Sequence, residues 1–317
     1  MNVLVTRHDK IGDFITILPL LKILKSNSNH RVIVLVSKVN YDLACEISYI
    51  DDVILYSESV YQNIIEIRKR KVDVSISCFI DAKLGLALFF SGIKTRVAPA
   101  TKLAQIFFNK TIKQKRSKVE KTEWQYNIDL LKQFQPEINT RFDQPLLEIT
   151  PKQVKSKQKI VAFHPGFGGS SEGNLKLDDY LRLAKSINKN LDVTVVFTFG
   201  PDDRSSKIYI ENEIDFNAKL IDSKMSLIEF CKLISSCEVF VSTSTGPMHL
   251  AGALNIKTLS FFGDSLFASS KRWAAISDTD KQENFEVPIN YGESFYLEVE
   301  DRLHNILSKD NSLRHNI

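Results

Sequence analysis

The stretch Glu238–Gly263, EVFVSTSTGPMHLAGALNIKTLSFFG, decides the fold class of this chain. Two short apolar runs, Glu238–Val241 and Thr258–Phe262, are typical of strands that are buried on both faces of a parallel sheet. Between them, Pro247 suits the first turn of a helix, because a proline there loses only an N–H that has no intrahelical partner. The stretch therefore predicts a strand, loop, helix, strand unit of an α/β fold.

The loop before this helix is rich in hydroxyl groups. It reads Ser242-Thr243-Ser244-Thr245-Gly246. Such a loop brings hydroxyls and free backbone N–H groups to the positive end of a helix, at the carboxyl edge of a parallel sheet, where anionic ligands bind. The alternative is that these residues only cap the helix. The loop predicts a phosphate site, and the capping interpretation stays open.

A second polar loop follows the strand predicted over Lys159–Phe163. It reads HPGFGGSSEG over residues 164–173 and leads to an amphipathic helix predicted over Leu177–Ile187. Closely spaced glycines let backbone N–H groups cradle a diphosphate. A nicotinamide-binding fingerprint is disfavoured because Ser171 stands at its third glycine position, and a P-loop because Asn174-Leu175 stand where Lys and Ser or Thr belong.

The N-terminus has the same strand-to-helix character. The strand predicted over Asn2–Thr6 leads through a charged turn, RHDK, into residues 11–22, whose apolar residues follow a helical period. Asp13 lies in the first turn of that helix, where an acid can either satisfy the helix dipole or face a site at the carboxyl end of the strand. Asp81 follows the strand predicted over Val72–Phe79, and it too can be a helix cap or a site residue.

The length of 317 residues indicates two domains of about 150 residues each. The first, residues 1–150, is predicted to be Rossmann-like, and residues 139–158, with Pro145 and Pro151, are predicted to be the linker. A second Rossmann-like domain is expected over residues 159–295, and a last helix over Tyr296–Leu307. Further elements are predicted for the first domain: strands Arg31–Val36 and Val53–Tyr56, and helices Tyr41–Ser48, Tyr61–Lys71, Ala82–Phe90 and Glu123–Phe134.

Composition excludes several classes of protein. Hydrophobic residues at 43% and charged residues at 25% are ordinary for a globular protein, and the longest apolar run, Leu84–Phe90, is far shorter than the roughly 18 residues of a membrane span. The first residues lack the order of a secretory signal, so we expect a cytoplasmic protein. Four scattered cysteines indicate reduced thiols rather than disulfides or a metal site: Cys45, Cys78, Cys231 and Cys237.

The net charge of +4 hides a strongly basic segment. Between Lys94 and Lys121 there are nine Lys or Arg residues against one Glu, and Phe107 and Phe108 lie among them. A charge run is usually a solvated face. One-sided charge beside apolar residues also suits an anionic lipid surface, whereas no aromatic-interleaved motif supports nucleic acid. We therefore expect an anionic acceptor or membrane surface as the partner of this segment.

Three motifs together resemble glycosyltransferase family 9, the ADP-heptose:lipopolysaccharide heptosyltransferases. They are the opening RHDKIGD over residues 7–13, the glycine loop HPGFGGS over residues 164–170, and TGPMHLA over residues 245–251 with Phe261-Phe262-Gly263. The resemblance spans nearly the whole chain. It implies a GT-B fold, α/β in class, in which two Rossmann-like domains flank an interdomain cleft and the last helix, residues 296–317, returns to the first domain.

The family resemblance also implies roles for particular residues. Asp13 matches the proposed catalytic base of an inverting transfer from ADP-heptose to the inner core of lipopolysaccharide, on Kdo-lipid A or a heptosyl acceptor. No cofactor and no metal are implied, and the enzyme would work peripherally on the cytoplasmic face of the inner membrane. The donor would contact Gly168, Gly169, Ser170, Ser171, Lys176, Ser244, Thr245, Gly246, Pro247, Met248 and His249, and the acceptor Arg7, Lys10, Lys113, Arg116 and Lys118.

Two positions depart from the family pattern, and two rival functions stay open. Ser244 stands where the family usually has an aspartate, and Lys176 lies near, but not at, the place of the family's lysine after the glycine loop. The rivals are a family member with another nucleotide sugar and a non-catalytic nucleotide- or lipid-binding protein. His249, taken alone, is better explained as a core residue, and its place in the family motif makes a contact with the donor an equally good interpretation. The string Asp278-Thr279-Asp280 is expected to be solvated loop rather than a metal site.

Overall fold

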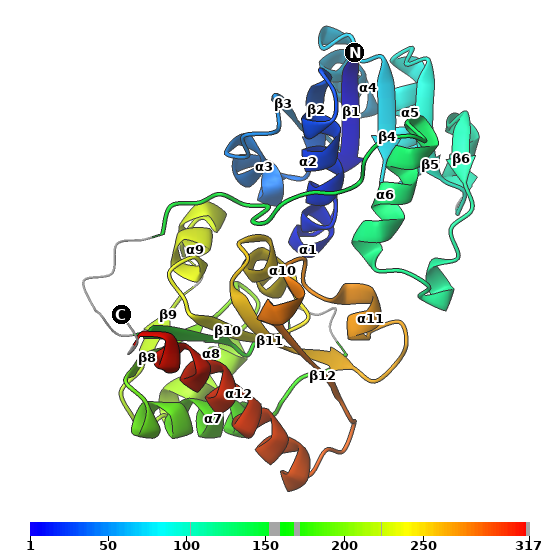
Figure 1. The fold of residues 1–317 in the computed structure, drawn as a ribbon. Helices are drawn as coiled ribbons and strands as arrows, with labels where there is room; N and C mark the ends of the chain where they lie inside the picture. The colour runs from blue at the N-terminus through cyan, green and yellow to red at the C-terminus, as the bar shows by residue number, and fades with distance from the viewer. Residues whose placement is uncertain (102, 152–158, 168–171, 223, 315–317) are drawn as a thin grey trace. The chain divides into compact units, whose positions relative to one another are not determined.

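The computed structural model describes residues 1–101, 103–151, 159–167, 172–222 and 224–314. The chain divides into two compact domains, Met1–Glu148 and Ile149–Ile317, blue to green and green to red in Figure 1. The division falls inside the stretch predicted to be the linker. Within the described residues, every helix is too short or too polar to span a bilayer.

The first domain is a six-stranded parallel sheet with the order β3-β2-β1-β4-β5-β6. Its central strands are apolar because both sheet faces are covered, and Leu4, Ile33 and Leu35 are fully buried. The strands are β1 Asn2–Arg7, β2 Arg31–Val36, β3 Asp52–Leu55, β4 Val74–Ser77, β5 Thr95–Pro99 and β6 Lys110–Ile112. The helices are α1 Ile11–Ile15, α2 Leu18–Ser26, α3 Lys38–Cys45, α4 Val60–Lys69, α5 Ala82–Phe90, η1 Leu103–Phe107, η2 Arg116–Lys118 and α6 Glu123–Phe134.

The second domain repeats this order as β12-β11-β10-β7-β8-β9. Phe163, Phe197 and Phe261 are fully buried in its core. The strands are β7 Lys159–His164, β8 Val193–Thr198, β9 Lys219–Ile221, β10 Val239–Thr243, β11 Lys257–Gly263 and β12 Gln282–Val287. The helices are α7 Leu177–Asn190, α8 Arg204–Glu213, α9 Leu227–Ile234, α10 Gly246–Ala253, α11 Ser270–Trp273, η3 Thr279–Lys281 and α12 Glu293–Arg314.

Both sheets therefore have a switch point, where the strand order reverses. It lies between β1 and β4 in the first domain and between β7 and β10 in the second. Ligands of open α/β sheets bind at the carboxyl ends of the strands beside such points. The two polar loops and the charged turn predicted from the sequence all leave these four strands.

One expectation needs correction. The single helix predicted over residues 11–22 is two helices, because Pro19 cannot donate to Ile15 and its ring crowds that carbonyl, so the chain restarts at α2. The last helix packs on the second domain, where Tyr296, Val299 and Leu303 are buried with the core around Phe261. Its return to the first domain stays a prediction.

Candidate functional site

The charged turn after β1 is organised around the buried guanidinium of Arg7. Its Nε donates to Oδ1 of Asp9 at 2.8 Å, its Nη1 donates to the carbonyl of Cys78 at 3.1 Å, and its Nη2 donates to Asp13. Arg7 is only 4% exposed, whereas the carboxylates of Asp9 and Asp13 are each 20% exposed. The buried arginine thus fixes the positions of two carboxylates that are partly exposed to solvent.

Electrostatics keep the guanidinium of Arg7 charged. Burial acts to lower the pKa of Arg7, but Asp13 and Asp9 outweigh burial and raise that pKa above its ordinary value. The pKa of Asp9 is raised, because burial outweighs the attraction of Arg7. Arg7 is therefore a permanent cation that positions Asp13, and its contact with the acceptor stays a prediction.

Asp13 is not the cap of its helix. The N-cap position of α1 is Lys10, and the carboxylate of Asp13 accepts from Arg7. The backbone carbonyl of Asp13 accepts from the hydroxyl of Thr16 at 2.6 Å, and the buried Asn127 of α6 donates to that same hydroxyl at 2.9 Å. Side chains from three segments therefore fix the turn that presents this carboxylate.

Asp81 is the helix cap that the sequence allowed, and it also pairs with His8. Its Oδ1 accepts from the N–H of Leu84 at 2.8 Å and caps α5, and its Oδ2 lies 2.6 Å from Nε2 of His8. The pKa of Asp81 is lowered: burial acts to raise it, but the hydrogen bonds from His8 and Leu84 prevail. The imidazole of His8 stacks on Tyr56, with ring centroids 4.2 Å apart.

A pocket of about 750 Å³ opens beside this pair, at the carboxyl ends of β1, β2, β3 and β4. This pocket was not predicted from the sequence, although the polar residues at the ends of the predicted strands were an available signal. We call it the first-domain pocket. Its lining residues are His8, Ser37, Lys38, Tyr56, Glu58, Phe79, Asp81, Ala82 and Lys83.

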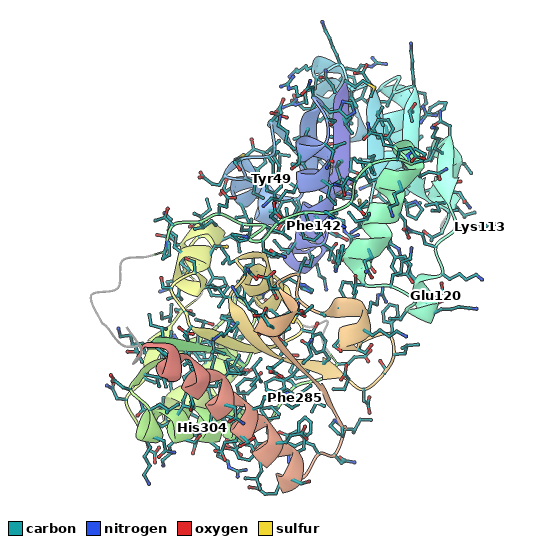
Figure 2. The ribbon with its side chains drawn as sticks, in the orientation of Figure 1. Tyr49, Lys113, Glu120, Phe142, Phe285 and His304 are labelled. Carbon is teal, nitrogen blue, oxygen red and sulfur yellow. The ribbon has the colours of Figure 1, made fainter. Side chains whose placement is uncertain are left out.

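The residues predicted for the acceptor divide into two groups. Arg116 pairs with the buried Glu123 and lies 5.5 Å from the ring of Tyr126, so its charge is used inside the domain, as is that of Arg7. The remaining three are exposed: Lys10, Lys113 and Lys118. Figure 2 shows Lys113 at the margin of the first domain.

The hydroxyl loop of the second domain leads into α10 as predicted. Thr245 is the N-cap residue, but its side chain makes no capping hydrogen bond; its hydroxyl is directed to the carbonyl of Thr243 at 3.3 Å. The first N–H groups of a helix have no intrahelical acceptor. The half-buried Ser244, Thr245 and Gly246 thus surround a helix start that offers N–H groups to an anion.

The ends of the glycine loop are fixed by close contacts. Gly173 lies so near β11 that a Cβ there would come within 2.0 Å of the carbonyl oxygen of Phe262, and its own carbonyl accepts from Thr243. Asn174 donates to the carbonyl of Pro165 at 3.0 Å and accepts from Tyr180 at 2.6 Å. The predicted donor residues Gly168, Gly169, Ser170 and Ser171 lie outside the described residues.

The other predicted donor residues differ in access. Met248 and His249 are buried, and burial lowers the pKa of His249 to about 4, so its imidazole is neutral at physiological pH. It packs edge-on against Trp273 with ring centroids 6.2 Å apart, as a core histidine does. Pro247 is half-buried, and Lys176 is exposed at the start of α7, with its ammonium 5.4 Å from the ring centre of Tyr291.

The Asp278-Thr279-Asp280 string has a structural explanation. Oδ2 of Asp278 accepts from the side-chain amide of Asn255 at 2.7 Å, and the N–H of Asp278 donates back to Oδ1 of Asn255 at 3.0 Å. This reciprocal pair fixes the loop before β12. In the described ranges of the chain, no cluster of three His, Cys, Asp or Glu side chains is placed to hold a metal.

The two parallel sheets with their flanking helices give this chain the GT-B fold. Residues throughout the chain align with solved structures of this class. The structure of "E. coli ADP-heptose lps heptosyltransferase II" matches with a TM-score of 0.81 at 18% identity, over 98% of this chain and 100% of that one. "E. coli heptosyltransferase WaaC with ADP" matches with a TM-score of 0.75 at 13% identity, over 96% and 100%.

Sequence comparison gives the family. Residues 112–291 match the sequence model of "Glycosyltransferase family 9 (heptosyltransferase)". A Haemophilus influenzae protein named "Putative glycosyltransferase" is 32% identical over 98% of this chain and 94% of its own length. The chain belongs to glycosyltransferase family 9, as its motifs indicated.

Proposed function

We propose that the chain is an inverting glycosyltransferase that transfers a heptose from ADP-heptose to the inner core of lipopolysaccharide. The main support is Asp13, a solvent-accessible carboxylate that a buried arginine holds at one switch point. A helix start suited to a diphosphate lies at the other. ADP-heptose and ADP are named with the two E. coli neighbours, which makes this nucleotide the first donor to test.

In the proposed reaction, Asp13 acts as general base. The acceptor hydroxyl oxygen attacks the anomeric carbon on the face opposite the diphosphate, and its proton passes to the carboxylate of Asp13. The bond from the anomeric carbon to the phosphate oxygen breaks, ADP leaves with that electron pair, and the configuration inverts. Arg7 positions the carboxylate and takes no proton.

The donor side stabilises the leaving diphosphate without moving protons. Its developing negative charge would accept hydrogen bonds from the backbone N–H groups of Gly246 and Met248 and from the hydroxyls of Ser244 and Thr245. The glycine loop at residues 168–171 would contribute as well. Lys176 adds an exposed cation at the start of α7. Ser244 contributes a hydroxyl where a carboxylate is usual in the family, so the sugar itself is the part of the proposal that most needs testing.

A transfer assay across several nucleotide sugars tests the function directly. ADP-heptose should give ADP and glycosylated acceptor, whereas other nucleotide sugars should give little of either. Turnover only with another sugar would replace heptose but keep the enzyme class. ADP binding without hydrolysis or transfer of any donor would favour a nucleotide-binding protein instead.

We further propose that the first domain works at an anionic membrane surface, on the cytoplasmic face of the inner membrane. The support is a group of exposed cations in one segment: Lys94, Lys110, Lys113, Lys115 and Lys118. Each basic residue near an anionic surface contributes about 1 kcal/mol of attraction. Arg96 and Arg116 are omitted because they bond inside the domain, to the carbonyl of Phe107 and to Glu123 respectively.

An apolar patch accompanies these cations. Leu103 and Ile106 on η1 are 90% and 75% exposed, and Phe89 and Phe90 at the end of α5 are 47% and 54% exposed. The guanidinium of Arg96 lies 5.2 Å from the ring of Phe89, so the patch adjoins the basic segment. Apolar residues beside lysines suit the boundary of headgroups and acyl chains.

A further inference from the structure

The proposed acceptor needs a binding site, and the first-domain pocket has the chemistry of one. Resting on the proposed function, we propose that this pocket binds an uncharged monosaccharide unit of the acceptor, rather than an acidic one. His8 follows Arg7, whose guanidinium holds Asp13, so the pocket and the proposed base belong to the same edge of the same sheet. A neutral sugar in this pocket would favour the heptosyl acceptor over Kdo-lipid A, whose terminal sugar is acidic.

The walls of the pocket suit a sugar ring. The rings of His8, Tyr56 and Phe79 form one aromatic group, with His8 stacked on Tyr56 and edge-on to Phe79 at 5.3 Å. Aromatic walls with a small number of fixed polar groups are typical of small-molecule sites. Such rings cover the C–H face of a pyranose, and the polar groups bond to its hydroxyls.

The polar groups are held before any ligand arrives. Asp81 is fixed through both oxygens, by the cap to Leu84 and by His8. The hydroxyl of Ser37 donates to the carbonyl of Asp9 at 2.9 Å and accepts from the side-chain amide of Asn40 at 3.2 Å, so its orientation is fixed. Burial raises the pKa of Tyr56 to about 12, so its phenol stays protonated and able to donate. A preorganised site of donors and acceptors binds hydroxyls with little ordering of its own.

Charge disfavours an acidic occupant. The lining contains two carboxylates, Glu58 and Asp81, and two ammonium groups, Lys38 and Lys83. Lys83 and Glu58 form an ion pair at 2.5 Å, and the carboxylate of Asp81 is bound by His8. Anion sites need a surplus of cationic donors, and ammonium groups do not outnumber carboxylates in this lining. A carboxylated or phosphorylated sugar would add negative charge beside two carboxylates, whereas a neutral polyol adds none.

The test compares two synthetic acceptors that share one aglycone and differ in the terminal sugar, one a neutral heptose and one a sugar acid. We expect the neutral acceptor to bind the full-length protein roughly tenfold more tightly, a difference of about 1.4 kcal/mol. Binding is measured by saturation-transfer NMR with ADP present, and KM by the transfer assay. Equal or tighter binding of the acidic acceptor would overturn the proposal.

Substitutions in the pocket test whether it causes the preference for the neutral acceptor. Asp81→Asn removes the charge, and asparagine is as good a helix cap as aspartate, so α5 should persist while the preference for the neutral acceptor narrows. Glu58→Gln should also narrow the preference. This side chain is 79% exposed and caps no helix, so the substitution should not change the stability of the fold. Glu120→Gln, outside the pocket, is the matched control.

The outcomes separate this inference from the function on which it rests. A preference that neither Asp81→Asn nor Glu58→Gln changes would place the acceptor elsewhere and defeat the inference. Saccharide binding that follows the predicted pattern, without any transfer, would support the pocket and defeat the proposed enzyme activity. ADP affinity, read from the second domain, should stay constant in all three variants.

Discussion

The two domains share one strand order but equip their carboxyl edges differently. The first edge carries titratable side chains: Arg7 donates to Asp9 and Asp13, and His8 pairs with Asp81. The second edge offers hydroxyls, glycines and a helix start, around Thr245, Gly246 and Gly173. The same scaffold has therefore been given titratable groups at one edge and backbone groups at the other.

This difference has a chemical consequence. A carboxylate can accept a proton, whereas backbone N–H groups can only stabilise charge that develops on a ligand. If the proposed function is right, proton transfer depends on the first edge and nucleotide binding on the second. Substitutions should then separate the two, and the following experiments test that separation.

The largest effect is expected from Asp13→Asn. Asparagine preserves shape and can still accept from Arg7, so the melting temperature and ADP affinity should change little. Loss of a general base should lower kcat by roughly 100-fold or more. The measurement is kcat beside Tm and the Kd for ADP.

Asp9→Asn is the matched control, because Asp9 is also bound to Arg7 and equally exposed. If pairing with Arg7 were what mattered, both variants should lose activity alike. Near-normal turnover in Asp13→Asn, or loss only because the protein unfolds, would remove Asp13 from the chemistry.

The second edge should be sensitive to backbone crowding. Gly173→Ala would place a Cβ within 2.0 Å of the backbone oxygen of Phe262, so the loop or the end of β11 must move. Overpacking of this kind destabilises by about 1–3 kcal/mol, and ADP binding should weaken with it. Gly292→Ala, where no atom lies within 4 Å of the added carbon, should leave both unchanged. Equal stability and equal ADP affinity in the two variants would show that the close approach of Gly173 to Phe262 has no effect on either property.

Acid should affect the second domain through two buried histidines. Burial lowers the pKa values of His164 and His249 to about 4. Below the ordinary value near 6.5 the unfolded chain binds protons that the folded domain does not. Stability present above pH 6.5 is therefore lost as the pH falls towards 4, by about 2 kcal/mol per histidine at pH 5.

The tryptophans allow each domain to be followed separately. Trp124 packs against Phe142 in the first domain, and Trp273 against His249 in the second. With Trp124→Phe, fluorescence should report urea midpoints that fall steeply between pH 6.5 and 5; with Trp273→Phe, the decline should be shallower. Parallel declines in both variants would argue against a dominant role of the two histidines.

How far the sequence predicts the structure depends on how local the cause is. The strand Arg31–Val36 was predicted with its observed bounds, because a continuous apolar run is the signature of a strand buried on both faces. The three-residue edge strands Lys110–Ile112 and Lys219–Ile221 were missed, since they are short and partly exposed. Their pairing with β5 and β8 is visible only in the folded sheet.

The site follows the same rule. The position of Asp13 at a strand-to-helix turn could be predicted, but the burial of Arg7 could not, because it depends on Cys78, contributed by the segment after β4. The pocket was predictable in principle, since His8, Ser37 and Tyr56 directly follow β1, β2 and β3. Recognising it required knowing which strands are neighbours.

A smaller effect is expected at the membrane. Replacing Lys113, Lys115 and Lys118 with Gln should weaken co-sedimentation with anionic liposomes by roughly tenfold, given about 1 kcal/mol per basic residue reduced by solvent screening. Added salt should have the same effect on the unmodified protein. The control replaces three exposed lysines of the second domain, Lys189, Lys219 and Lys271, and should change nothing. Binding that ignores both salt and the first triple variant would exclude this surface.

Removal of metal ions is expected to have no effect on kcat. If amides and hydroxyls at the second edge stabilise the leaving diphosphate, the reaction needs no divalent cation, and chelation with EDTA should leave kcat unchanged. The control for the reagent is a metal-dependent glycosyltransferase assayed in the same buffer, which EDTA must inactivate. If EDTA abolished turnover and magnesium or manganese restored it, a cation would be neutralising the diphosphate. The second edge would then also act through a charged group, and the contrast between the two edges would be incomplete. Unchanged turnover, together with weaker ADP binding in Gly173→Ala, would place that stabilisation in the backbone of the loop.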